Sequence, residues 1–153
     1  MNNSIQMVVF RAEEGNYAVN IDRVERIIGY SKITAIPETS DYVLGMINYQ
    51  DSILPIVDLS RRFYPGGTQH GEECKILVIA LDGYKVGLLV DSVEEIASID
   101  EERIETPSSV IEGISPEYIT GLIKDGEDII IYLNVDKIFQ NEKEAELINI
   151  QEG

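Results

Sequence analysis

Short apolar runs of four to seven residues, rich in β-branched side chains and separated by turn residues, dominate the chain. Runs of this length and composition are typical of β-strands. They predict ten strands, at residues 5–11, 16–21, 27–30, 44–49, 52–57, 75–81, 85–90, 95–98, 119–124 and 128–134. Helical patterning is confined to residues 141–148, so the chain is expected to be all-β with one short C-terminal helix.

Two stretches of the chain resemble two later stretches in the same order. Residues 42–59 align without a gap on residues 118–135, and residues 17–27 align on residues 84–96 with a two-residue insertion in the later copy. Five strands per copy suit a small barrel. We therefore expect a single domain over residues 1–153, made of two five-stranded barrels in tandem pseudo-repeat. The predicted halves are residues 5–68 and 74–139, followed by a helix or tail at 140–153.

The charge of the chain limits its partners. The formal net charge is −16, from 28 acidic and 12 basic residues. This charge disfavours nucleic acid and anionic membranes, and it is consistent either with solubility alone or with docking on a basic partner. No apolar run is long enough to predict a membrane span, and a single cysteine, Cys74, fits a reducing compartment. We expect a cytoplasmic protein with no direct membrane insertion.

Catalytic chemistry has few candidate residues in this sequence. One histidine, His70, and one cysteine cannot assemble an ordinary zinc site, and no phosphate-binding or nucleophile motif is present. Asp58, Asp91 and Asp136 each follow an apolar run, where carboxylates usually cap turns. We expect no enzyme activity, metal or cofactor. One alternative remains, a small acidic ligand-binding or hydrolytic barrel, which would need converging carboxylates.

A duplicated β unit offers a groove between its halves and exposed strand edges, both of which can bind a helix or another sheet. Apolar residues that follow the second strand of each copy are candidates to line this groove: Val24, Ile27, Ile28, Val93 and Ile96. Burial in the core is the alternative, because β-branched residues in strands are mostly inside.

The segment 42–59 resembles the pattern G-x-x-N-x-R-G-x-x-x-P-x-x-D-L of the CheW-like chemotaxis coupling proteins, through Gly45, Asn48, Pro55, Asp58 and Leu59. Residues 17–28, 86–93 and 118–122 extend the similarity over almost the whole chain, from about residue 6 to residue 139. The resemblance implies two SH3-like five-stranded barrels. It also implies an adaptor without catalysis or cofactor, which couples methyl-accepting chemoreceptors to the chemotaxis histidine kinase.

In the family, one barrel binds the regulatory domain of the kinase, and the helical tip of the receptor lies between the barrels. Carried over by motif, Val24, Gly45 and Asn48 fall in the region that the family uses for these contacts. With their neighbours and repeat counterparts, the candidate partner-binding residues are Val24, Arg26, Ile27, Gly45, Asn48, Gln50, Asp51, Val93 and Ile96.

The chain departs from the family where the pattern has Arg-Gly, because Gln50 and Asp51 stand there. Gln keeps a hydrogen-bonding group but loses the charge and the planar fork of Arg. Asp adds a negative charge and a Cβ, yet it tolerates turn geometry, so the turn is expected to persist. The departure leaves open a second interpretation, a CheW-like scaffold of a receptor–kinase pathway outside motility. Residues 48–51 correspond to residues 124–127 in the second copy, which therefore lacks the recognition motif.

Overall fold

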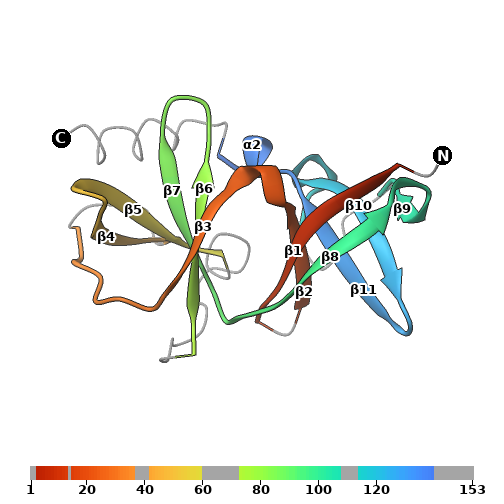
Figure 1. Ribbon diagram of the computed structural model, residues 1–153, viewed down its shortest axis with the longest axis horizontal. Coiled ribbons are helices and arrows are strands. Elements are labelled where there is room, and N and C mark those ends of the chain that lie inside the picture. The colour runs from red at the N-terminus through yellow and green to blue at the C-terminus, as the bar shows by residue number, and fades with distance from the viewer. Residues whose placement is uncertain (1–2, 14, 37–41, 60–72, 108–113, 140–153) are drawn as a thin grey trace.

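The computed structural model describes residues 3–13, 15–36, 42–59, 73–107 and 114–139. Strands dominate it, and Figure 1 shows them gathered into two sheets side by side, with the short helix α2 between them. The strands are β1 (Ser4–Ala12), β2 (Gly15–Asn20), β3 (Val24–Gly29), β4 (Val43–Tyr49), β5 (Ser52–Asp58), β6 (Lys75–Ala80), β7 (Lys85–Val90), β8 (Ser92–Asp100), β9 (Ile104–Glu105), β10 (Ile119–Asp125) and β11 (Asp128–Leu133). Helical turns occur at η1 (Ile21–Arg23), η2 (Glu101–Arg103), η3 (Pro116–Tyr118) and α2 (Val135–Ile138). None of the helices in the described ranges is long and apolar enough to cross a membrane.

The internal repeat is also a repeat of topology. One sheet has six strands in the order β8-β1-β2-β11-β10-β9, and the other has five in the order β3-β6-β7-β5-β4. The repeat pairs β1 with β6, β2 with β7, β3 with β8, β4 with β10 and β5 with β11. Replacing each strand of the first sheet by its counterpart reproduces the order of the second, with β9 as an addition. The all-β, SH3-like fold expected from the sequence is confirmed.

Each sheet takes strands from both copies, so the sheets do not follow the predicted halves 5–68 and 74–139. β1 and β2 lie in the six-stranded sheet, whereas β3, β4 and β5 lie in the other. The cause is an exchange of edge strands, because β3 pairs with β6 of the later copy and β8 pairs with β1 of the earlier one. Two parallel pairs, β2 with β11 and β5 with β7, complete the exchange.

The predicted tail at 140–153, including the helix expected at 141–148, lies outside the described residues.

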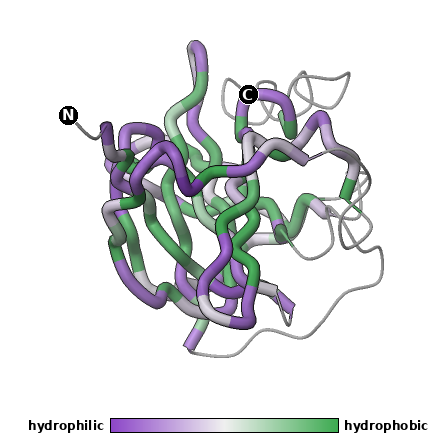
Figure 2. The backbone as a smooth tube through the Cα atoms, turned by 90° about the vertical axis from the view of Figure 1, so that its right-hand side faces the viewer, coloured by the Kyte–Doolittle hydropathy of each residue, from purple (hydrophilic) through white to green (hydrophobic). Residues whose placement is uncertain are grey.

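Three apolar clusters fill the fold. The largest takes residues from both sheets, among them Phe10, Tyr17, Leu77 and Leu88, and so joins the sheets into one unit. The second cluster belongs to the five-stranded sheet and the third to the six-stranded sheet. Figure 2 shows the hydrophobic parts of the strands running through the interior while hydrophilic residues lie at the turns. Because burial of one Leu or Phe side chain stabilises by about 1.5–3 kcal/mol, the shared cluster is the main stabilising contact between the sheets.

Gly45 and Gly121 are counterparts in the repeat, and both lie where another segment crosses closely. A Cβ on Gly45, whose φ is +152°, would lie 2.1 Å from the backbone oxygen of Thr34. Thr34 forms a bridge with Met46, through two hydrogen bonds of 2.9 Å. A Cβ on Gly121 would lie 2.2 Å from the Ile104 side chain on β9, the strand that pairs with β10. Both glycines therefore allow an extra segment to cover a sheet edge.

We expect Gly45→Ala to lower the free energy of unfolding by about 3 kcal/mol, because the new methyl group meets backbone and the positive φ is strained. Equilibrium urea unfolding measures the loss. Gly29→Ala is the matched control, since a Cβ there meets nothing within 4 Å, and it should change stability by about 0.5 kcal/mol or less. Equal stability of the two variants would contradict this packing role.

Candidate functional site

The hairpin of β4 and β5 presents a two-residue turn, Gln50-Asp51, between the paired residues Tyr49 and Ser52. Gln50 has φ +49° and Asp51 has φ +63°, so both occupy the left-handed region. This is the pattern of a type I′ turn, which matches the twist of a hairpin. The expectation that the turn persists is therefore confirmed. A non-glycine residue held there costs about 1–2 kcal/mol, and strain of this kind often marks functional positions.

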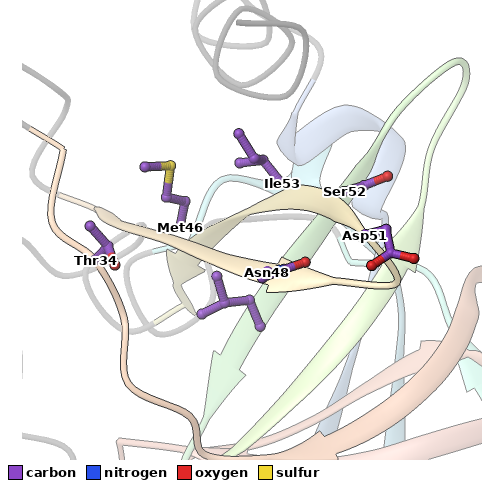
Figure 3. Close-up of a pocket in the computed structure, with 7 residues that line it drawn as sticks. Thr34, Met46, Asn48, Asp51, Ser52 and Ile53 are labelled. Carbon is purple, nitrogen blue, oxygen red and sulfur yellow. The ribbon is translucent and has the colours of Figure 1, made fainter.

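A pocket of about 300 Å³ lies on the outer side of this hairpin. Figure 3 shows Asn48 on β4 and Asp51 at the tip of the hairpin, with Thr34 on the neighbouring segment. Seven residues line the pocket: Thr34, Met46, Ile47, Asn48, Asp51, Ser52 and Ile53. Apolar walls with an amide, two hydroxyls and one carboxylate can hold a protruding side chain of a partner and orient it by hydrogen bonds.

A buried tyrosine joins the hairpin to the opposite edge of its sheet. Tyr49 is only 8% exposed, and its hydroxyl donates a 2.7 Å hydrogen bond to Oε2 of Glu25 on β3. Lys85 Nζ on β7 lies 2.9 Å from Glu25 Oε1 and donates a 3.1 Å hydrogen bond to Oε2. Because β3 and β4 are the two edge strands of the five-stranded sheet, these contacts close the sheet at this corner.

These contacts also shift the proton affinities of Glu25 and Tyr49. The hydrogen bond from Lys85, followed by that from Tyr49, lowers the pKa of the Glu25 carboxyl below its ordinary value of 4.5. Burial, together with the hydrogen bond to Glu25, raises the pKa of the Tyr49 hydroxyl above 10.0. At neutral pH the Glu25 carboxyl is therefore ionised and the Tyr49 phenol is neutral.

Only the first copy can build this closure. The repeat counterparts of Tyr49, Glu25 and Lys85 are Asp125, Glu94 and Ala18, so the phenol and the ammonium are both missing. Glu94 instead accepts a 2.9 Å hydrogen bond from Ser92 Oγ. The prediction from sequence missed this cluster, and its only signal was the mismatch between the copies at these three positions.

The edge strands β3 and β8 carry the apolar candidates. Val24 and Val93 are half-buried against the shared core cluster. Ile27 is 38% exposed and Ile96 is 57% exposed. Ile27 pairs with Leu77 and Ile96 with Val8, which both belong to the shared cluster. Paired residues project to the same face, so each isoleucine extends the apolar surface of the shared core at a sheet edge.

The nine predicted contact residues fall into three places. The Glu25–Tyr49 hydrogen bond brings two of these groups to neighbouring parts of one sheet. The first group lies on β3 (Val24, Arg26 and Ile27), and the second lies on the β4–β5 hairpin (Asn48, Gln50 and Asp51). Val93 and Ile96 lie on β8, in the other sheet. Gly45 is buried, and its contact with Thr34 gives it a packing role within the fold. Ile28, a candidate for the groove, packs instead into the cluster of the five-stranded sheet.

Two of the carboxylates considered for a catalytic site, Asp58 and Asp136, lie in different surroundings. Asp58 is fully buried, and its backbone N–H donates a 2.8 Å hydrogen bond to the Tyr42 carbonyl. Asp136, which lines two further pockets, forms an ion pair with Arg23. Among the residues that the structure describes, no group of three or more His, Cys, Asp or Glu side chains is placed to hold a metal ion.

Two related sheets with exchanged edge strands define a duplicated SH3-like fold, and the β4–β5 hairpin with its pocket lies on one of them. Residues 6–143 match the family model of the CheW-like domain, and the chain belongs to this family. Chemotaxis protein CheW of Treponema pallidum is 28% identical over 149 residues, covering 95% of this chain and 88% of the relative. The CheW protein of Klebsiella aerogenes is 29% identical over 145 residues, covering 95% and 87%. The crystal structure of scaffolding protein TtCheW from Thermoanaerobacter tengcongensis superposes with a TM-score of 0.84 at 31% identity, covering 94% of this chain and 92% of that one.

The Glu25 cluster predicts a pH-dependent contribution to stability. Because the pKa of Glu25 is lower in the folded protein than in the unfolded chain, its contribution is present above pH 4.5 and is lost as the pH falls through the folded pKa. The stability difference between wild type and Glu25→Gln should therefore shrink below pH 4.5. Urea unfolding between pH 3 and pH 8 measures it, with Glu94→Gln as the control. A difference that is the same at both ends of this range would contradict the prediction.

Proposed function

We propose that this protein is a non-catalytic chemotaxis adaptor that couples methyl-accepting chemoreceptors to the chemotaxis histidine kinase through the regulatory domain of the kinase. The observation that carries the proposal is the family match over residues 6–143, supported by a fold shared with a scaffolding protein. In this proposal the protein works in the cytoplasm, recruited to receptor arrays at the membrane.

The arrangement of the candidate residues supports two separate contacts. β3 and β8 place exposed apolar side chains at both edges of the shared core, which suits the apolar face of a receptor helix. The pocket beside Asn48 and Ser52 lies on the hairpin of one sheet only, which suits a protruding side chain of the kinase domain. Gln50 follows Tyr49, whose hydroxyl bonds Glu25 on β3, and this link supports a contact of Gln50 with a partner bound along β3.

A second candidate function is a CheW-like scaffold in a receptor–kinase pathway outside motility. The observation that favours it is the Gln50-Asp51 turn, which keeps the hairpin geometry but replaces the charge that the family pattern carries there. The identity of the receptor and kinase partners separates the two candidates. Binding should therefore be measured against receptor tips and kinase regulatory domains of several pathways from the same organism.

The direct test immobilises the purified protein and titrates it with a receptor hairpin fragment and with an isolated kinase regulatory domain. We expect both to bind. We also expect Ile27→Ser to lower the affinity for the receptor fragment about tenfold or more, as for an apolar anchor at the centre of an interface. Ile129→Ser is the matched control, since Ile129 is 49% exposed on β11 and outside the candidate surface. Binding to neither fragment would overturn the proposed function.

Gln50→Arg tests the departure from the family pattern. The substitution restores the planar guanidinium of the family pattern at position 50, so it should tighten binding to a standard receptor tip by about tenfold, the effect of one charge-assisted hydrogen bond. Calorimetric titration of the two proteins side by side measures the change. Unchanged or weaker affinity would mean that the surface around position 50 has been rebuilt or is unused, and would contradict the prediction.

A further inference from the structure

The pocket beside the β4–β5 hairpin combines apolar walls with a charged rim. Asn48 pairs with Ile53 across the hairpin, and Met46 lies two residues before Asn48, so these three side chains share one face. Asp51, at the tip of the hairpin, also lines the pocket (Figure 3). The pocket volume of about 300 Å³ is at the lower end of the range for small-ligand pockets, so the pocket suits one long side chain.

The carboxylate of Asp51 has no basic partner within the described part of the chain. It is exposed, and no ion pair between described residues involves it. Lys32, two residues before Thr34, does not line the pocket and forms no salt bridge with a described residue. A carboxylate beside apolar walls is complementary to a basic side chain, whose methylene groups lie on the apolar surface while its charge meets the acid.

The second copy places a basic side chain where the first copy has its pocket. Lys124 on β10 is the counterpart of Asn48. Its Nζ atom lies 3.8 Å from Oε1 of Glu105 on β9. β9 pairs with β10 as the segment around Thr34 bridges to β4. The lysine therefore extends from its hairpin toward the covering strand, across the part of the surface that is hollow in the first copy.

Both hairpin turns carry an acid, but the first hairpin has lost the cation beside it. Glu127 in the second turn is the counterpart of Asp51. Residues 43–58 of the first hairpin contain neither Lys nor Arg, because Asn48 stands where the second copy has Lys124. The Lys124–Glu105 pair is exposed and adds little to stability, but it indicates the kind of side chain that this face accommodates.

We propose that the pocket binds one lysine or arginine side chain of the kinase regulatory domain, with the charged group against Asp51 and the methylene groups along Met46 and Ile53. The partner side chain takes the place that Lys124 occupies in the second copy. The net charge of −16 favours such a basic contact surface. None of the described residues that line the pocket lies on β3 or β8, the strands proposed to bind the receptor, which favours the kinase as the partner.

Asp51 then acts as a specificity determinant of this chain. The family pattern has glycine at this position, which offers a partner no charge. A carboxylate there favours a partner with a basic side chain and disfavours one with an acidic side chain by like-charge repulsion. This inference rests on the proposed binding of the kinase regulatory domain.

Asp51→Asn tests the charge without disturbing the turn, because Asn is a preferred residue of type I′ turns. At low salt the variant should bind an isolated kinase regulatory domain about fivefold or more weakly than the wild type, and the difference should shrink at high salt. Glu127→Gln is the matched control, since it removes the same charge from the equivalent turn. Calorimetric titration measures both. Equal losses in the two variants, or no loss in either, would overturn the inference.

Asn48→Lys tests the pocket itself. The variant carries in the first hairpin the lysine that the second hairpin has, so this side chain should occupy the pocket and lower the affinity for the kinase domain about tenfold. Lys124→Asn, the reverse exchange, is the matched control and should leave the affinity unchanged. Urea unfolding of each variant checks that the fold is intact. Unchanged binding by a folded Asn48→Lys variant would contradict the proposed contact.

A receptor hairpin fragment, titrated in parallel, separates the partners. If Asp51→Asn weakens binding of the receptor fragment but not of the kinase domain, the inference is wrong while the proposed function stands. The same holds if the wild type and both pocket variants bind the kinase domain equally well. If the wild type binds neither fragment, the proposed function fails, and the inference fails with it.

Discussion

The fold depends on the pairing of β3 with β6 and of β8 with β1, because these two ladders carry strands of one copy into the sheet of the other. The shared apolar cluster takes residues from both of the sheets that this exchange creates, so it packs the exchanged strands together. The exchange also brings β3 and β8, which occupy the same place in each copy, to equivalent edges of two different sheets. The proposed receptor surface is a direct result, since one edge of each sheet borders the same shared core.

Local pattern was sufficient to predict most strands, and the reason is visible in the clusters. Buried runs such as Ile76–Ile79 alternate between the shared cluster and the cluster of their own sheet, so they are continuously apolar and bounded by turns. The sheet that each strand joins could not be predicted in the same way. Strand assignment depends on pairing between residues far apart, and the hydrophobic pattern of β3 is equally compatible with a partner in either copy.

The candidate site likewise has features that follow from local sequence and features that depend on contacts between distant residues. Asn48, Gln50 and Asp51 were chosen through the family pattern, and the turn at Gln50-Asp51 could be predicted because the turn chemistry of two adjacent residues is a local property. The closure by Glu25, Tyr49 and Lys85 was missed because it joins three strands, and no local signal shows that an acid, a phenol and an amine will meet. Gly45 lies between these cases. Its match to Gly121 was visible in the repeat, but only the structure shows why each position excludes a side chain: Gly45 because the Thr34 segment crosses it, and Gly121 because Ile104 on β9 does.

The exchanged strands also bear on the ancestry of the chain. One copy contributes two strands to one sheet and three to the other, so a single copy completes neither sheet. A protein made of one copy would satisfy its strand edges most simply as an intertwined homodimer, with two identical faces related by a two-fold axis. Fusion of the two copies into one chain removes that enforced identity. A surface that symmetry would have kept uniform could then acquire an asparagine on one hairpin and a lysine on the other.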